Sequence, residues 1–157
     1  MNIFYLDHDI RYSAKAHCDK HIVKMIIEYA QLLSTAHYVL DGKQVGYKPT
    51  HKNHPCAIWV RQSAYNYVYL LALFNAVCIE YTKRYNKVHK TESLVDILTT
   101  IPINAPLGVF TEPPQCMPED CKGEDTVEAY RKYYINYKSS FAKWKHGAPI
   151  WWPIKEI

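Results

Sequence analysis

The sequence lacks the features of a secreted or membrane-spanning protein. Its first residues, Met-Asn-Ile-Phe-Tyr-Leu-Asp, contain neither the basic start nor the long apolar run of a signal peptide. Residues 62–79 carry no charge, but they include three tyrosines and the amides Gln62, Asn66 and Asn75, which hydrocarbon disfavours. We therefore predict that this stretch is a central helix surrounded by protein, and that the chain does not engage a membrane.

The cysteines form no recognisable framework. They are odd in number and irregularly spaced: Cys18, Cys56, Cys78, Cys116 and Cys121. Without a secretion signal, such cysteines indicate reduced thiols in a reducing compartment. We expect a cytoplasmic protein.

A polybasic tail is also missing. The net charge is +4 with histidine neutral, whereas the chain contains 14 tyrosines and 4 tryptophans. Aromatic faces beside lysine and arginine suit nucleotide bases and backbone phosphates. Aromatic side chains also fill protein cores, so composition alone leaves nucleic acid open as a partner.

The length of 157 residues and the 48% share of hydrophobic residues fit one domain, residues 1–157, with a single core. Apolar residues at helical spacing predict a long helix over residues 13–40, with Ser13 as its N-cap. A second long helix is predicted over residues 55–85, because Pro55 suits the first turn of a helix. The sequence therefore indicates two long central helices.

The remaining segments are predicted to be shorter or irregular. Residues 3–6 form an apolar run that suits a strand or an extended arm, and a short helix is expected near residues 92–98. Five prolines predict an irregular surface loop over residues 101–123. Asp125, followed three residues later by a glutamate, is typical of a capping box that opens an aromatic helix over residues 126–144. The predicted fold class is mostly α.

The first long helix carries the most informative polar residues. His17, His21, Lys24, Glu28 and Gln31 are spaced by four, three, four and three residues, so they share one face of the predicted helix. A solvated face is the ordinary explanation for such a stripe. However, two imidazoles, an ammonium and a carboxylate within contact range are also the groups that acid–base chemistry uses. We expect His17, His21, Lys24 and Glu28 to converge on a cleft.

A metal site is a second explanation of the same residues. Histidines four residues apart, as His17 and His21 are, can face one ion. The pair lacks the glutamate that follows the first histidine in a zinc-protease helix, since Cys18 stands there. No other histidines or cysteines have a recognisable ligand spacing. We therefore predict no cofactor and no stoichiometric zinc or iron.

Two further regions suit a nucleic acid. Asn53, His54 and Trp59 lie at the start of the second helix, where backbone amides favour an anion such as phosphate, although ordinary helix capping explains Asn53 equally well. Basic residues fall in three groups, at residues 43–52, 83–87 and 131–145. They include Lys43, Lys48, Lys52, Lys83, Arg84, Lys87, Arg131, Lys132, Lys138, Lys143 and Lys145. If the groups flank one cleft, they would follow a phosphate backbone.

The order of these residues resembles the pyrimidine-dimer DNA glycosylase family of the phage endonuclease V type. The resemblance covers residues 18–86. It depends on Asp19-Lys20-His21, Lys24, Glu28, Gln31, Asn53-His54-Pro55, Trp59, Glu80 and Arg84. Beyond them, only a C-terminal region rich in tryptophan, tyrosine and lysine matches.

The resemblance implies a small helical protein that acts on double-stranded DNA, in the host cytoplasm if a phage encodes it. It implies that Glu28 is catalytic and that the N-terminal amine attacks the sugar of a damaged nucleotide. The base then leaves through a Schiff base, from which elimination nicks the strand. In the family the nucleophile is a small residue exposed by removal of methionine. Here Asn2 follows Met1 and is expected to leave Met1 in place, so the amine is that of Met1.

The resemblance thus implies a DNA glycosylase that acts on damaged or modified pyrimidines, with AP-lyase chemistry as its second step. Catalysis is assigned to Glu28, His21, Lys24 and Met1. His17, Gln31, Asn53, His54, Trp59, Lys83, Arg84 and Lys132 are assigned to binding. The alternative is a non-enzymatic phage protein that binds a nucleotide or nucleic acid in the same pocket, in an anti-defence or host-takeover role.

Overall fold

The computed structural model describes residues 1–153, which form six α-helices, two short 3₁₀ helices and no strand. The elements in chain order are α1 (Ile10–Ala16), α2 (Asp19–Asp41), α3 (Pro55–Gln62), α4 (Ala64–Tyr85), η1 (Lys90–Leu94), α5 (Val95–Leu98), η2 (Glu119–Cys121) and α6 (Thr126–Tyr137). The predicted mostly α fold is confirmed.

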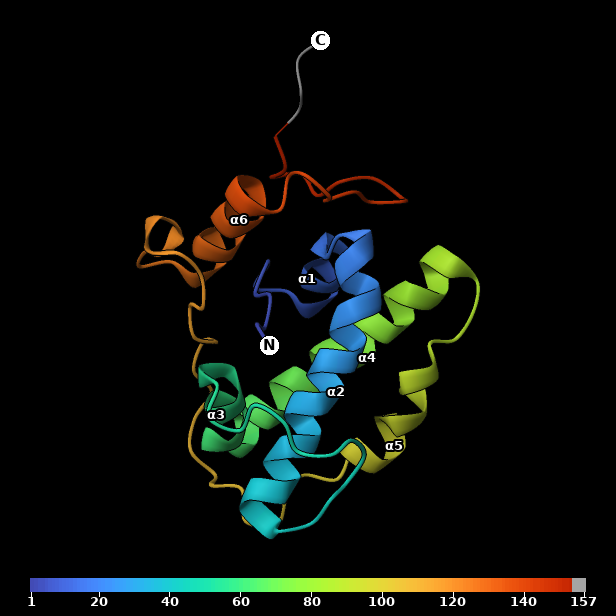
Figure 1. The fold of residues 1–157 in the computed structure, drawn as a ribbon. Helices are drawn as coiled ribbons and strands as arrows, with labels where there is room; N and C mark the ends of the chain where they lie inside the picture. Colours follow the sequence, from blue (N-terminus) through green and yellow to red (C-terminus); the bar gives the residue numbers. More distant parts are fainter. Residues whose placement is uncertain (154–157) are drawn as a thin grey trace.

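Helices α2 and α4 are the two long helices, and they lie against each other through the centre of the molecule (Figure 1). Both supply fully buried apolar side chains, such as Ile26 and Phe74, to the core. Helix α2 ends at Gly42 with a φ of +69°, and α4 ends at Asn86 with a φ of +54°. Both residues adopt the left-handed conformation that commonly terminates an α-helix.

The predicted single helix over residues 13–40 is wrong, because the chain breaks between α1 and α2. Helix α1 begins earlier, at the N-cap Asp9, whose carboxylate accepts hydrogen bonds from two amides of the first turn. The chain is extended at His17 and Cys18. The break leaves the carbonyls of Lys15 and His17 without hydrogen-bond partners inside a helix. The Arg84 guanidinium of α4 donates a hydrogen bond to each of them.

Ser13 is therefore not an N-cap but lies inside α1, fully buried. Its hydroxyl donates to the carbonyl of Phe4 and accepts from the amide of Leu6. These bonds attach the buried residues 3–6 to α1. Residues 3–6 form an extended arm, one of the two conformations predicted for them.

The second predicted helix, over residues 55–85, is also broken, at Ser63. This residue is extended, with φ −154° and ψ 155°, and its hydroxyl caps α4 by accepting from the Asn66 amide. The same hydroxyl donates to the carbonyl of Val109, and the Ala64 amide donates to the carbonyl of Pro106. The predicted loop over residues 101–123 thus supplies the hydrogen-bond partners that make a helix break at Ser63 favourable. None of the described helices is long and apolar enough to cross a membrane.

Helix α6 begins as predicted, with Asp125 accepting from the Glu128 amide, but it ends at Tyr137 rather than near residue 144. It covers the N-terminal arm, because the ring of Phe4 lies 5.5 Å from that of Tyr134. In Figure 1 the N-terminus consequently lies inside the molecule, between α6 and α2. The fold therefore buries the first residues of the chain next to the middle of α2.

Candidate active site

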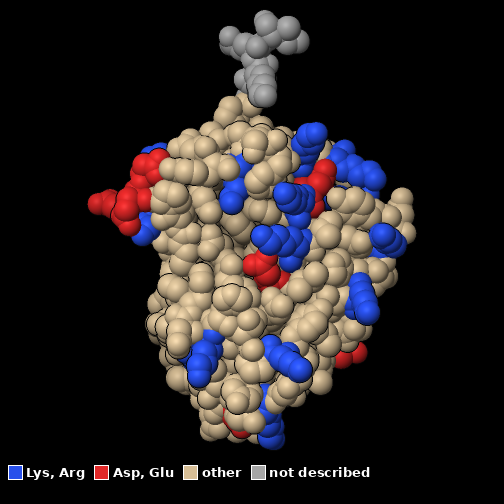
Figure 2. Space-filling view, in the orientation of Figure 1, with Lys and Arg blue, Asp and Glu red and all other residues tan. Residues whose placement is uncertain are grey.

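A cavity of about 190 Å³ opens where the N-terminal arm, α2 and α6 meet. Its lining comprises Met1, Asn2, Phe4, His21, Lys24, Met25, Glu28, Tyr133 and Lys138. On the face shown in Figure 2, basic side chains gather around a central acidic group. All four residues that the sequence assigned to catalysis line this one cavity.

Glu28 holds the central position among these residues. One carboxylate oxygen lies 3.0 Å from the amine of Met1, and the other lies 3.6 Å from the Lys24 ammonium. Lys24 and Glu28 are one helical turn apart on α2, which is why their side chains meet. Glu28 retains only 15% of its side-chain exposure, whereas Lys24 retains 64%. The carboxylate is therefore shielded, and two amines compete for it.

His21 lines the cavity as a neutral group. Burial, followed by the charge of nearby groups including Lys138 and Lys24, lowers its pKa to about 3. Its Nδ1 lies 2.6 Å from the Tyr134 hydroxyl, and its ring stacks on Phe4 at 4.4 Å. A neutral, fixed imidazole contributes shape and hydrogen bonding here, rather than positive charge for a phosphate.

His17 does not reach the cavity. It is fully buried, and its two ring nitrogens lie 2.7 Å from the carbonyl of Ser13 and 2.7 Å from the hydroxyl of Tyr29. The break between α1 and α2 removes it from the face that carries His21. With both nitrogens engaged, His17 has none free to share a metal ion with His21.

Burial lowers the pKa of His17 to about 4, so the protein should lose stability as the pH falls. An unfolded histidine takes up a proton near pH 6.5, and the folded one does so only near 4. As the pH falls from 6.5 to 4, the free energy of unfolding is therefore expected to decrease by roughly 3 kcal/mol because of this residue.

Urea unfolding at a series of pH values measures this decrease. The variant His17→Gln should flatten this dependence, and replacing the exposed His146 should not. Equal slopes in wild type and His17→Gln would contradict the prediction.

Helix α6 and the residue that caps its C-terminus add two residues that the sequence did not assign to the site. Tyr133 and Lys138 close the cavity on the side facing α2, and the Lys138 ammonium lies 4.7 Å from the centre of the Tyr133 ring. The sequence identified Lys138 only as one of several basic residues. Nothing in its spacing indicated that the N-terminal arm would bring α6 to α2.

The other basic residues assigned to DNA lie elsewhere. The Arg84 side chain is buried and forms ion pairs with Asp19 at 3.0 Å and Glu80 at 3.1 Å, so it holds α1, α2 and α4 together. Lys83 lines a groove beside α1, and Lys132 lines another beside α6. None of the three lines the cavity.

The remaining assigned residues surround α3 and α2. His54 caps α3, with Nδ1 accepting from the Cys56 amide at 3.0 Å, and Asn53 beside it is exposed. Burial, and then the charge of the N-terminal amine, lowers the pKa of His54. Trp59 is buried, and its indole N–H donates to Thr111. Half-buried Gln31 lies on α2 after Glu28, outside the cavity lining.

This arrangement defines a class: an all-helical protein whose N-terminal amine meets a shielded carboxylate in a small cavity with basic side chains. The model of the pyrimidine dimer DNA glycosylase family matches residues 1–93, more than half of the chain. The chain belongs to this family. No curated protein and no solved structure matches it. The match includes the arm and α1 to α4, whereas the α6 side of the cavity lies outside it.

Proposed function

We propose that the protein excises a damaged or modified pyrimidine from double-stranded DNA and then cleaves the strand at the abasic sugar. The observation that carries the proposal is the 3.0 Å contact between the Met1 amine and the Glu28 carboxylate, inside the segment that matches the family. The five free cysteines favour a cytoplasmic site of action.

The proposed reaction begins with the amine of Met1. The Glu28 carboxylate is close enough to accept a proton from it and so expose its lone pair. The amine nitrogen attacks C1′ of the target nucleotide, and the bond to the base breaks, with its electron pair leaving on the base. Ring opening gives a Schiff base between Met1 and the sugar. Loss of a proton from C2′ then breaks the C3′–O bond and releases the 3′ phosphate.

Glu28 has a second role in this scheme, because positive charge develops on the sugar as the base departs. A shielded carboxylate stabilises such charge more strongly than it would in water. The neutral ring of His21, held by Tyr134, forms a fixed wall for the sugar. The target nucleotide must leave the base stack to reach this cavity, a step that is easiest for a damaged or mismatched base.

The function is tested with ultraviolet-irradiated and undamaged duplexes of the same sequence. We expect abasic sites and nicks at pyrimidine pairs in the irradiated duplex only, and a covalent adduct when borohydride is present. A protein that binds the irradiated duplex but leaves it intact would be the non-enzymatic binder. A protein that neither binds nor cleaves any duplex would exclude DNA as the substrate.

Lys24 and Lys138 line the same cavity as Glu28, and we expect both to contact phosphates of the bound DNA. Each lost phosphate contact lowers the slope of log affinity against log salt by about 0.9, so the double variant Lys24→Gln/Lys138→Gln should lower it by about 1.8. A salt titration of duplex binding measures the slope. The control double variant Lys83→Gln/Lys132→Gln removes the same charge from other grooves. Equal slopes for the two double variants would contradict this placement of the DNA.

A further inference from the structure

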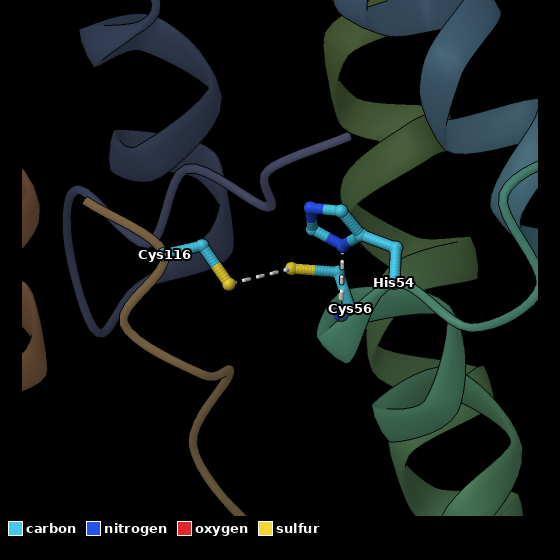
Figure 3. Close-up of side chains that lie close together, drawn as sticks. All are labelled: His54, Cys56 and Cys116. Carbon is cyan, nitrogen blue, oxygen red and sulfur yellow. Dashed lines mark hydrogen bonds between the residues drawn. The ribbon is translucent and has the colours of Figure 1, made fainter.

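Beneath the N-terminal arm, three side chains form a cluster, which we call the thiol cluster: His54, Cys56 and Cys116 (Figure 3). The two sulfur atoms lie 3.8 Å apart, although the residues are separated by 60 positions in the sequence. Cys56 is fully buried in the first turn of α3, and Cys116 is partly exposed on the proline-rich loop. A pair with one accessible and one buried thiol has the arrangement of a redox-active pair.

The loop that carries Cys116 is held in this position from both sides. The side-chain amide of Asn2 donates to the Cys116 carbonyl at 2.7 Å, and the Tyr130 hydroxyl of α6 donates to the carbonyl of Pro114. The approach of the two sulfurs is thus part of the fold, because the arm and α6 both fix the loop. It also connects Cys116 to the residue that follows Met1.

A metal ion fits the thiol cluster less well than oxidation does. The spacing alone admits an ion, because the three potential ligand atoms lie within 4.8 Å of one another, but the hydrogen bonding of His54 disfavours one. Nδ1 of His54 already accepts a hydrogen bond from the Cys56 amide, so the proton of the neutral ring is on Nε2 and no lone pair is free. Binding through either nitrogen would break the cap of α3.

The two thiols differ in pKa, as the oxidation of one thiol and its later attack by the other require. The hydrogen bond from the Cys56 thiol, with smaller contributions from the charges of Lys122 and the N-terminal amine, lowers the pKa of Cys116 to about 7. The hydrogen bond to Cys116 and burial raise the pKa of Cys56. Cys116 is thus the thiolate that an external oxidant reaches first, and Cys56 holds its proton.

We propose that Cys116 and Cys56 form a reversible oxidation site, in which Cys116 reacts with hydrogen peroxide and Cys56 resolves the product into a disulfide. The Cys116 thiolate attacks the peroxide, the O–O bond breaks, and a sulfenic acid and hydroxide form. Cys56 gives its proton to this hydroxide, and its sulfur attacks the sulfenic sulfur. The S–S bond forms, and the departing hydroxide takes up a proton as water. The peroxide is reduced, and the two thiols are oxidised.

Little movement is needed for this bond to form. The sulfurs must close from 3.8 Å to about 2.05 Å, the length of a disulfide. Because Cys56 is fixed in α3 and the backbone of the loop is held by Asn2 and Tyr130, rotation of the Cys116 side chain supplies most of this shift. The disulfide would fasten the loop to α3 and, through the Cys116 carbonyl, restrain Asn2 beside the cavity.

The test uses the whole, reduced protein, treated with hydrogen peroxide and then analysed by intact mass and non-reducing peptide mapping. We expect a loss of two hydrogen atoms, a fall from five free thiols to three, and a Cys56–Cys116 peptide that dithiothreitol restores. The Cys56→Ser variant should instead accumulate a sulfenic acid on Cys116, which dimedone traps. The control Cys121→Ser, on the same loop, should still form the disulfide.

Three results would overturn the proposal. They are oxidation that joins Cys116 to Cys121, a Cys56→Ser protein that loses the same two hydrogens, and a reduced wild type that peroxide leaves unchanged. Circular dichroism of each variant establishes that it is folded. Because no DNA is used, the outcome is independent of the proposed function.

Discussion

Replacing Glu28 by glutamine is expected to lower the rate of base excision by about 100-fold or more, the usual cost of removing one electrostatic catalytic group. Glutamine keeps the size of the side chain and its ability to accept a hydrogen bond, but it carries no charge. It can neither take a proton from the Met1 amine nor balance the positive sugar. Single-turnover excision on an irradiated duplex measures the rate.

The same variant should retain its fold and its affinity for the duplex, because Glu28 lies at the cavity rather than in the core. The matched control is Glu119→Gln, which removes a carboxylate from an exposed ion pair with Lys122. It should excise at the wild-type rate. Wild-type excision by Glu28→Gln would remove this carboxylate from the mechanism. A large loss of melting temperature would show instead that the contact with Met1 is mainly structural.

The part of the site that could be predicted from sequence is the part that lies on one helix. His21, Lys24 and Glu28 are spaced by three and four residues, so helical geometry alone brings them to one face, and all three line the cavity. His17 has the same spacing, but the chain breaks before α2. Its position is set by contacts with Tyr29 and Ser13, which helical periodicity does not encode.

A pattern of apolar residues could not predict the two helix breaks. Ser63 has no proline or glycine beside it, and it ends α3 because its hydroxyl and the next amide find partners near residues 106–109. Arg84 was predicted to bind DNA because arginine suits phosphate. Its guanidinium is instead taken up by two carboxylates and two carbonyls, since it closes the gap between α1 and α2.

Contacts between distant segments account for the rest. Lys138 reaches the cavity only because Phe4 of the arm packs against the rings of α6. Cys116 approaches Cys56 only because the proline-rich loop follows α3 on its way to α6. In each case an irregular segment, the arm or the loop, makes the contact, and its course depends on side-chain hydrogen bonds rather than on periodicity.

The identity of the nucleophile is the prediction with the largest expected effect. Two amines contact Glu28, but they differ in burial and distance: the Met1 amine is 3.0 Å away on a side chain that is 6% exposed, and the Lys24 ammonium is 3.6 Å away and 64% exposed. Placing Gly-Ser before Met1 moves the terminal amine by about 3.8 Å per added residue. A displacement of only about 1 Å can cost on the order of 100-fold in rate, so borohydride trapping should fall by at least that factor.

Peptide mapping of the trapped wild-type adduct should place the sugar on Met1, in a protein whose intact mass establishes Met1 as its first residue. Lys24→Gln should still form the adduct, with weaker DNA binding, because we propose that its ammonium contacts phosphate and not C1′. A Gly-Ser extension after Ile157 serves as the control for the added residues and should trap at the wild-type level. An adduct on Lys24, or full trapping by the N-terminally extended protein, would transfer the nucleophile to the lysine. Glu28 would then activate the side chain one turn before it on α2, and the buried arm would serve only to shape the cavity.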